Sequence, residues 1–103
     1  MATSNERLVS ASLTNSLSTL YTVPADKKAS ATGVIICNNG SVARLVTLKY
    51  AGKFIFSSYS MAAKETLALS VPAVLYETET IQGSQDSGTD VDVTISGIEE
   101  DVP

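Results

Sequence analysis

Apolar and polar residues alternate with a period of two along most of this chain, a pattern that favours β-strands over helices. The clearest case is residues 91–95 (VDVTI), and a similar stretch over 17–23 ends at Pro24, which has no N–H for a sheet ladder. Residues 33–37 (GVIIC) form a continuous apolar run, long enough for a strand and too short for a buried helix. We therefore expect this run to be a central strand.

Turn-forming residues separate the strands that follow. Residues 38–41 (NNGS) tolerate positive φ, so they predict a tight turn and an antiparallel hairpin between the central strand and a strand over 42–50. Residues 51–53 (AGK) predict the next reversal, into a strand over 54–59 that carries aromatic residues for cross-strand pairing.

The second half of the chain is more finely divided. A strand is expected over 66–71, followed by another over 74–81 whose acidic residues alternate outward. Residues 82–88 are polar and bounded by glycine, so we interpret them as a loop before the last strand.

Taken together, these segments predict an all-β fold of about seven to eight strands, arranged as an antiparallel β-sandwich. Immunoglobulin-like and jelly-roll strand orders both fit the pattern. We expect a single domain over 13–100, preceded by a flexible N-terminal arm over 1–12 and followed by an acidic tail over 101–103. The arm could alternatively form a short edge strand.

The composition of the chain argues against two classes of partner, nucleic acids and membranes. The 103 residues carry seven Lys and Arg against eleven Asp and Glu, a net charge of −4, which disfavours nucleic-acid binding. No stretch approaches the roughly 20 apolar residues of a membrane span, so no membrane partner is expected. A hydrophobic fraction of 44% argues against disorder.

Catalytic equipment is sparse in this sequence. The chain has no histidine, which removes imidazole bases and most zinc sites. Two pairs of alternating acids, Asp90 with Asp92 and Glu77 with Glu79, could act as acid and base or bind calcium, but a solvated strand face is the favoured interpretation. Cys37 lies in an apolar run and is expected to be a buried, inert thiol. We predict no catalytic residue, metal site or cofactor.

Four short motifs occur in a fixed order: LYTVPADK (20–27), AKETL (63–67), TIQG (80–83) and VDVTISGIE (91–99). In this order they resemble small virion structural proteins of tailed bacteriophages, over about residues 13–100. Asp26 stands where the family pattern often has glycine. The resemblance rests on the order of the motifs, since no single one is specific.

The resemblance implies a β-sandwich structural protein of the virion, made in the host cytoplasm. Such a subunit would dock on capsid, neck, collar or tail proteins as a decoration or connector. It implies a homo-oligomer with virion proteins as partners, and no enzymatic activity or cofactor.

Two groups of residues are candidates for the interface with these partners, although core filling is the plainer explanation of the aromatic group. They are Arg7, Leu8, Val9 and Leu13 in the N-terminal segment, and Phe54, Phe56 and Tyr59 further along. The alternative function is a carbohydrate-binding or adhesin-like sandwich used in host recognition. Its candidate stacking residues are Tyr50, Phe54, Tyr59 and Tyr76.

Overall fold

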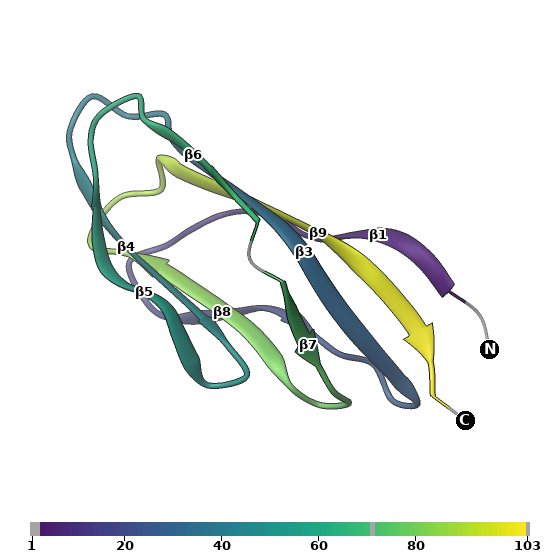
Figure 1. The fold of residues 1–103 in the computed structure, drawn as a ribbon. Coiled ribbons are helices and arrows are strands. Elements are labelled where there is room, and N and C mark those ends of the chain that lie inside the picture. The colour runs from purple at the N-terminus through teal and green to yellow at the C-terminus, as the bar shows by residue number, and fades with distance from the viewer. Residues whose placement is uncertain (1–2, 71, 103) are drawn as a thin grey trace.

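The computed structural model describes residues 3–70 and 72–102 (Figure 1). These described residues form nine β-strands in two antiparallel sheets, and none of them is helical. The strands are β1 (Thr3–Ser12), β2 (Ser18–Thr22), β3 (Lys27–Asn38), β4 (Arg44–Tyr50), β5 (Lys53–Met61), β6 (Thr66–Leu69), β7 (Ala73–Leu75), β8 (Thr80–Gln85) and β9 (Val91–Asp101). The predicted antiparallel β-sandwich is therefore confirmed.

The strand order decides between the two sandwich topologies that the sequence left open. One sheet has the order β1-β9-β3-β6, with β7 also paired to β3, and the other has β2-β8-β4-β5. Strands β6 and β7 pair with different parts of β3, namely Val34–Cys37 and Ala29–Ala31, so together they act as one interrupted edge strand. Counted in this way, the eight strands follow the jelly-roll order rather than the immunoglobulin order.

The core lies between the two sheets and collects one side of each strand. In β9 the side chains of Val91, Val93 and Ile95 are buried, as the alternation predicted. In β3, which is a central strand as expected, Val34 and Ile36 are buried by the same alternation.

The outer face of β3 carries the residues between these positions. Ile35 is exposed there, and Cys37 is half-buried with its sulfur 3.4 Å from the Thr66 hydroxyl. The expectation that Cys37 is a core thiol is therefore wrong, because a strand in a two-layer sandwich alternates its faces even where its sequence is continuously apolar.

The hairpin predicted at 38–41 does not form. Strands β3 and β4 belong to different sheets, so residues 39–43 cross from one sheet to the other. Asn38 holds this crossing in place, because its buried amide nitrogen donates to the carbonyl oxygens of Val42 and Met61. Asn and Gly indicate a change of direction, but they do not say which sheet receives the next strand.

Residues 74–81 also differ from the single strand that was predicted. Strand β7 ends and β8 begins on either side of a turn over 76–79, and the two strands lie in opposite sheets. Within this turn the Tyr76 N–H donates to the Glu79 carboxylate at 2.7 Å. The alternation of residue types continues through residues 76–79, so the sequence pattern gives no sign of this turn.

The segment over 82–88, expected to be a loop, contributes its first four residues to β8. Gly83 faces the core there, and a Cβ at this position would lie 2.9 Å from a methyl group of Leu13 and 3.1 Å from one of Leu20. Glycine at this position therefore leaves room for the side chains of Leu13 and Leu20 in the core rather than marking a loop.

The predicted reversal at 51–53 is confirmed. Strands β4 and β5 form a hairpin whose two-residue turn has φ values of +51° at Ala51 and +79° at Gly52. Two successive positive φ values match the right-handed twist of the strands that they connect. The turn of this β4–β5 hairpin lies at the bottom of the view in Figure 1, on the side of the β7–β8 turn that is away from the C-terminus.

At the N-terminus, β1 runs antiparallel along β9 at the edge of its sheet. The register shifts between Arg7 and Val9, so that the consecutive residues Leu8 and Val9 are both buried. The segment over 1–12, expected to be an arm, thus contains an edge strand from Thr3 to Ser12. Residues 1–2 lie outside the described residues.

Across residues 3–70 and 72–102, the structure contains no helix that is long and apolar enough to cross a membrane.

Candidate interaction surfaces

The N-terminal group of candidate interface residues is divided by the fold. Leu8, Val9 and Leu13 are buried and belong to the core cluster between the sheets. Arg7 is exposed at the start of the irregular stretch of β1. In the folded chain the three apolar residues therefore attach β1 to the sandwich, and only Arg7 is available at the surface.

The aromatic group lies together on β5, the edge strand of the second sheet. Phe54 and Tyr59 are 60% and 39% exposed, and Phe56 is partly buried against the core. The rings of Phe56 and Tyr59 lie 5.5 Å apart, tilted by 40°. The structure thus keeps these three aromatic residues near the surface, with Phe54 the most exposed of them.

Strand β5 pairs with β4 on one side and forms the sheet edge on the other. Its pairing is irregular, with register shifts on both sides of Leu48, and Ser58 has a φ of +52°. The Ser58 N–H donates to the Thr47 hydroxyl at 3.2 Å instead of to a ladder carbonyl. Such bulges twist an edge strand, which makes unspecific strand pairing with other chains harder.

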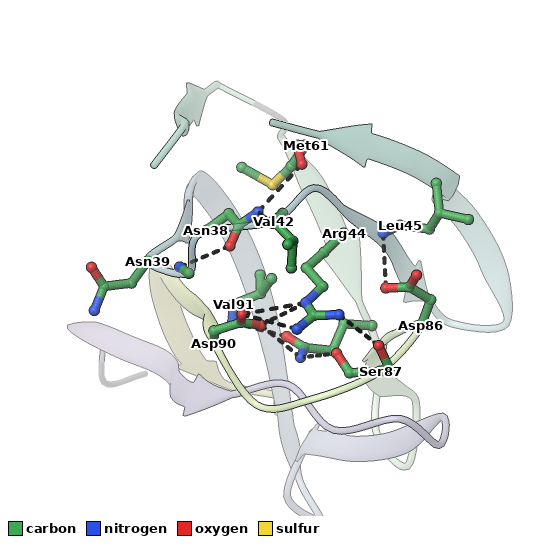
Figure 2. Close-up of polar contacts among 12 residues, drawn as sticks. Asn38, Asn39, Val42, Arg44, Leu45, Met61, Asp86, Ser87, Asp90 and Val91 are labelled. Carbon is green, nitrogen blue, oxygen red and sulfur yellow. Dashed lines mark hydrogen bonds and ion pairs between the residues drawn. The ribbon is translucent and has the colours of Figure 1, made fainter. Parts of the chain in front are cut away.

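A polar network occupies one end of the sandwich, where β3, β4, β8 and β9 begin or end (Figure 2). Its four central residues are Asn38, Arg44, Gln85 and Asp90, and we call them the polar network. The Arg44 Nε donates to Asp90 at 3.0 Å, its Nη2 donates at 3.2 Å, and its Nη1 donates to the Ser87 hydroxyl at 2.6 Å. The bidentate pair joins the start of β4 to the loop before β9.

Electrostatics within the polar network follow from this pairing. Hydrogen bonds from Arg44 hold the pKa of Asp90 below its usual value, since they stabilise the carboxylate. The same hydrogen bond raises the pKa of Arg44. Gly40 lies so close to Asp90 that a Cβ there would overlap the carboxylate, so glycine is required beside the ion pair.

Gln85 connects this ion pair to the core. Its side chain is buried, and its amide oxygen accepts from the Val91 N–H at 2.8 Å. Its amide nitrogen donates to the Ser87 carbonyl at 2.6 Å and to Asp90 at 3.1 Å. The amides of Gln85 and Asn38 thus satisfy backbone groups of the loops, which makes the polar network a structural clamp.

We call the opposite end of the sandwich, where the β2–β3, β4–β5 and β7–β8 turns lie, the open end. The β2–β3 turn, the β7–β8 turn and the residues after β9 surround a hollow of about 240 Å³. We call it the acidic hollow and define it by its lining residues Asp26, Lys27, Tyr76, Glu77 and Val102. Tyr76 is 60% exposed, and Lys27 forms an ion pair with Asp101.

The tip of the β4–β5 hairpin lies at this same end (Figure 1). We define the hairpin tip by Lys49, Lys53 and Phe54. The Lys49 ammonium lies over the Phe54 ring, 4.8 Å from its centroid, which is a cation–π contact. Lys53 is exposed and belongs to neither of the two ion pairs found in the described part of the chain.

The acidic pairs expected on strand faces have separate environments. Asp90 lies before β9 and pairs with Arg44, whereas Asp92 lies on the outer face of β9 and accepts from the Ser12 hydroxyl at 2.6 Å. Glu77 and Glu79 lie in the β7–β8 turn, where they accept backbone N–H groups. Among the described residues, no three Cys, Asp or Glu side chains gather closely enough to hold a metal ion.

Tyr50, one of the four candidate stacking residues, is only 4% exposed. Its hydroxyl is buried without a hydrogen-bond partner among the described residues, and burial raises its pKa to about 12. A ring in this position cannot stack on an external sugar. Phe54, Tyr59 and Tyr76 remain exposed.

The polar network was not expected from the sequence. The period-two pattern of Ile81, Gly83 and Gln85 within β8 was the available signal, because it places Gln85 on the buried side. No sequence pattern indicated that Arg44 and Asp90 meet, since 46 residues separate them.

No protein-family model and no curated protein matches this chain. Two solved structures, both described as a pentameric capsid protein isolated from metagenomic phage sequences, are similar over 92% of the chain. Their sequence identities are 11% and 12%, with TM-scores of 0.42 and 0.35. This chain spans 61% and 62% of their lengths. Similarity of this extent assigns neither a family nor a function to the chain.

Proposed function

We propose that this protein is a non-enzymatic structural component of a bacteriophage virion. It docks as a homo-oligomer on capsid, neck, collar or tail proteins, as a decoration or connector subunit. The order of the four motifs from residue 20 to residue 99 supports this role, and so does the jelly-roll strand order. Jelly rolls occur in viral capsid proteins as well as in lectins and cupins, so the fold supports this role only by analogy.

The observation that carries the proposal is where the exposed rings lie. Phe54 and Tyr59 are on the edge strand β5, and Tyr76 is in a turn at the end of the sandwich. The polar groups of the opposite end are instead bonded to one another in the polar network. Rings on projecting elements of a rigid frame suit contact with other protein subunits.

Mass spectrometry of density-gradient-purified phage particles tests this role. The tryptic peptide over 54–64 should co-purify with the particles at a constant ratio to the major capsid protein. A high ratio would indicate capsid decoration, and a ratio of a few copies per particle would indicate a neck or tail ring. Abundance in the lysate without enrichment in intact particles would contradict a virion role.

A carbohydrate-binding module is the second candidate, favoured by the exposed Tyr76 ring beside the acidic hollow. Aromatic faces flanked by carboxylates can hold sugars through stacking and hydrogen bonds. A glycan array with the wild-type chain and the Tyr76→Ala and Tyr59→Ala variants tests it. Glycan binding that is lost in a variant would favour this candidate, and an array without a hit would count against it.

A further inference from the structure

The two most exposed aromatic side chains of the described residues lie at the same end of the sandwich. Phe54 in the hairpin tip and Tyr76 in the acidic hollow are each 60% exposed. They belong to different elements, the β4–β5 hairpin and the β7–β8 turn, and both lie opposite the polar network. One end of the molecule therefore presents two separate apolar contact points to solvent.

The charges around these two rings have opposite signs. The hairpin tip carries the ammonium groups of Lys49 and Lys53, neither of which forms an ion pair within the described ranges. The acidic hollow is lined by Asp26 and Glu77 and also by Lys27, whose charge is paired with that of Asp101. A basic aromatic surface and an acidic aromatic surface thus occur on one chain with net charge −4.

Within one molecule, the hairpin tip belongs to strands β4 and β5, whereas the acidic hollow lies at the β2–β3 and β7–β8 turns. Strand β5 is one edge of its sheet and β2 is the opposite edge, with β8 and β4 between them. The acidic hollow lies beside the β2–β3 turn, near the C-terminal end of β9 (Figure 1). The β7–β8 turn of the hollow leads into β8, which pairs with β4, so the two surfaces are neighbours at this end. No ion pair among the described residues joins Lys53 to Asp26 or Glu77 within one chain, which leaves both surfaces available to a neighbouring copy.

We propose that the hairpin tip of one copy docks into the acidic hollow of a second copy. Phe54 packs against Tyr76 and Val102, while Lys53 approaches the carboxylates of Asp26 and Glu77. This contact rests on the proposed homo-oligomeric role and names the surfaces that would build the oligomer. Because the two surfaces differ, the contact is head-to-tail, and repeating it produces a closed ring or an open chain rather than a two-fold dimer.

Charge complementarity favours a second copy over a glycan as the occupant of the hollow. A neutral sugar leaves the ammonium groups of the hairpin tip without a partner, whereas a second copy pairs them with carboxylates. Opposite charges across a contact also steer association and exclude wrongly oriented encounters. The contact should therefore weaken at 1 M salt, where charges are screened beyond about 3 Å.

Charge reversal tests the contact directly. We would measure the mass distribution of wild-type protein, Lys53→Glu, Glu77→Lys and the double variant over a concentration series, by size-exclusion chromatography with light scattering. Each single variant gives residues 53 and 77 charges of the same sign, and we expect association at least tenfold weaker. The double variant exchanges the charges at these two positions and should restore association to within about threefold of the wild type.

Three controls make the outcomes distinct. Lys64→Glu is a matched charge reversal in the β5–β6 loop, at the end of the sandwich that carries the polar network. This variant should associate like the wild type. Glu77→Gln removes the charge but retains an oxygen that can accept the Asp26 N–H. Thermal unfolding of each variant shows whether a loss of association is a loss of folding, and Phe54→Ser repeats the test at a position exposed in the single chain.

A wild-type chain that stays monomeric at all concentrations would overturn the contact and the oligomeric part of the proposed function together. Association that none of the folded variants changes would overturn this contact alone and leave oligomerisation in place. Glycan binding at Tyr76 with unchanged self-association would also overturn it. Loss in both single variants with recovery in the double variant would support it.

Discussion

The two ends of this jelly roll differ in whether their side chains are bonded within the chain or exposed to solvent. At one end, Arg44, Asp90 and Gln85 bond to each other and to the loop backbone. At the other end, Lys53 and the rings of Phe54 and Tyr76 project into solvent.

This difference suggests a division of roles within one small domain. Satisfied buried amides fix a single loop arrangement, because any alternative leaves polar groups unbonded. Exposed rings and unpaired charges contribute little to the stability of an isolated chain and are available to a partner. We therefore expect substitutions at the polar network to affect folding, and substitutions at the open end to affect association.

The largest expected effect is at Asn38. Asn38→Ala leaves the carbonyl oxygens of Val42, Met61 and Ala62 without their shared donor and Gly40 without its acceptor. We expect a loss of about 3 kcal/mol in the free energy of unfolding, because unsatisfied buried polar groups cost about 1–3 kcal/mol each. Urea denaturation would measure it, with Asn39→Ala as the exposed neighbouring control. Equal effects at both positions would contradict the clamp.

Tyr50 lies near the open end but is buried, so it should behave like a core residue. Its raised pKa of about 12 means that the folded chain holds the phenolic proton more tightly than the unfolded chain, whose value is about 10. The contribution of protonated Tyr50 to the free energy of unfolding should be fully present below pH 10. It should fall by about 2 to 3 kcal/mol as the pH rises towards 12. At pH 7, Tyr50→Phe should be neutral or stabilising by about 1 kcal/mol, since it removes an unbonded hydroxyl.

Denaturation at pH 8, 10 and 11.5 would measure this dependence. Tyr50→Phe should show a smaller loss at high pH than the wild type, and Tyr59→Phe, at an exposed ring, should behave like the wild type. Identical pH profiles for all three proteins would mean that Tyr50 titrates in the folded state as it does in the unfolded chain.

A smaller effect, seen as a difference between acid and neutral pH, is expected at Asp90. Its pKa is lowered by Arg44, so the contribution of the pair is present above the unfolded pKa and is lost as the pH falls through the lower, folded pKa. Asp90→Asn should destabilise the chain at pH 7 and have little effect at pH 2. Denaturation of both proteins at the two pH values tests this expectation, and an equal difference at both would exclude the ion pair as its cause.

The smallest effect on stability is expected at the open end. Phe54→Ser and Tyr76→Ser remove side chains that are already 60% exposed, so the free energy of unfolding should change by less than about 0.5 kcal/mol. Thermal unfolding at low protein concentration would measure it. A large loss for either variant would show that its ring stabilises the single chain, and would remove the contrast between the two ends.

Much of the fold could be predicted from local patterns. The alternation in Val91, Val93 and Ile95 reports a half-buried strand, and Gly52 reports the hairpin between β4 and β5. These signals are strictly local, because they depend on residues two or three positions apart. The signal at 38–41 was equally strong, but it marks a crossing between sheets, since a turn sequence does not contain the position of the receiving sheet.

The exposure of the candidate interface residues was predictable only in part, for the same reason. The aromatic residues of β5 lie near the surface, but Leu8, Val9 and Leu13 are buried, because β1 pairs with the distant strand β9. Before that pairing is known, an apolar segment near a terminus is equally consistent with an arm and with an edge strand.

By itself, the sequence determined the β class, the approximate positions of most strands, the acidic charge and the absence of histidine. The tertiary structure alone decided the jelly-roll order, the buried amide of Gln85, and the meeting of Arg44 with Asp90. The physical reason is that strand patterning arises from side chains alternating along a single strand. Sheet order and polar partners arise from pairing between segments far apart in the chain, where loop closure and mutual burial select one arrangement.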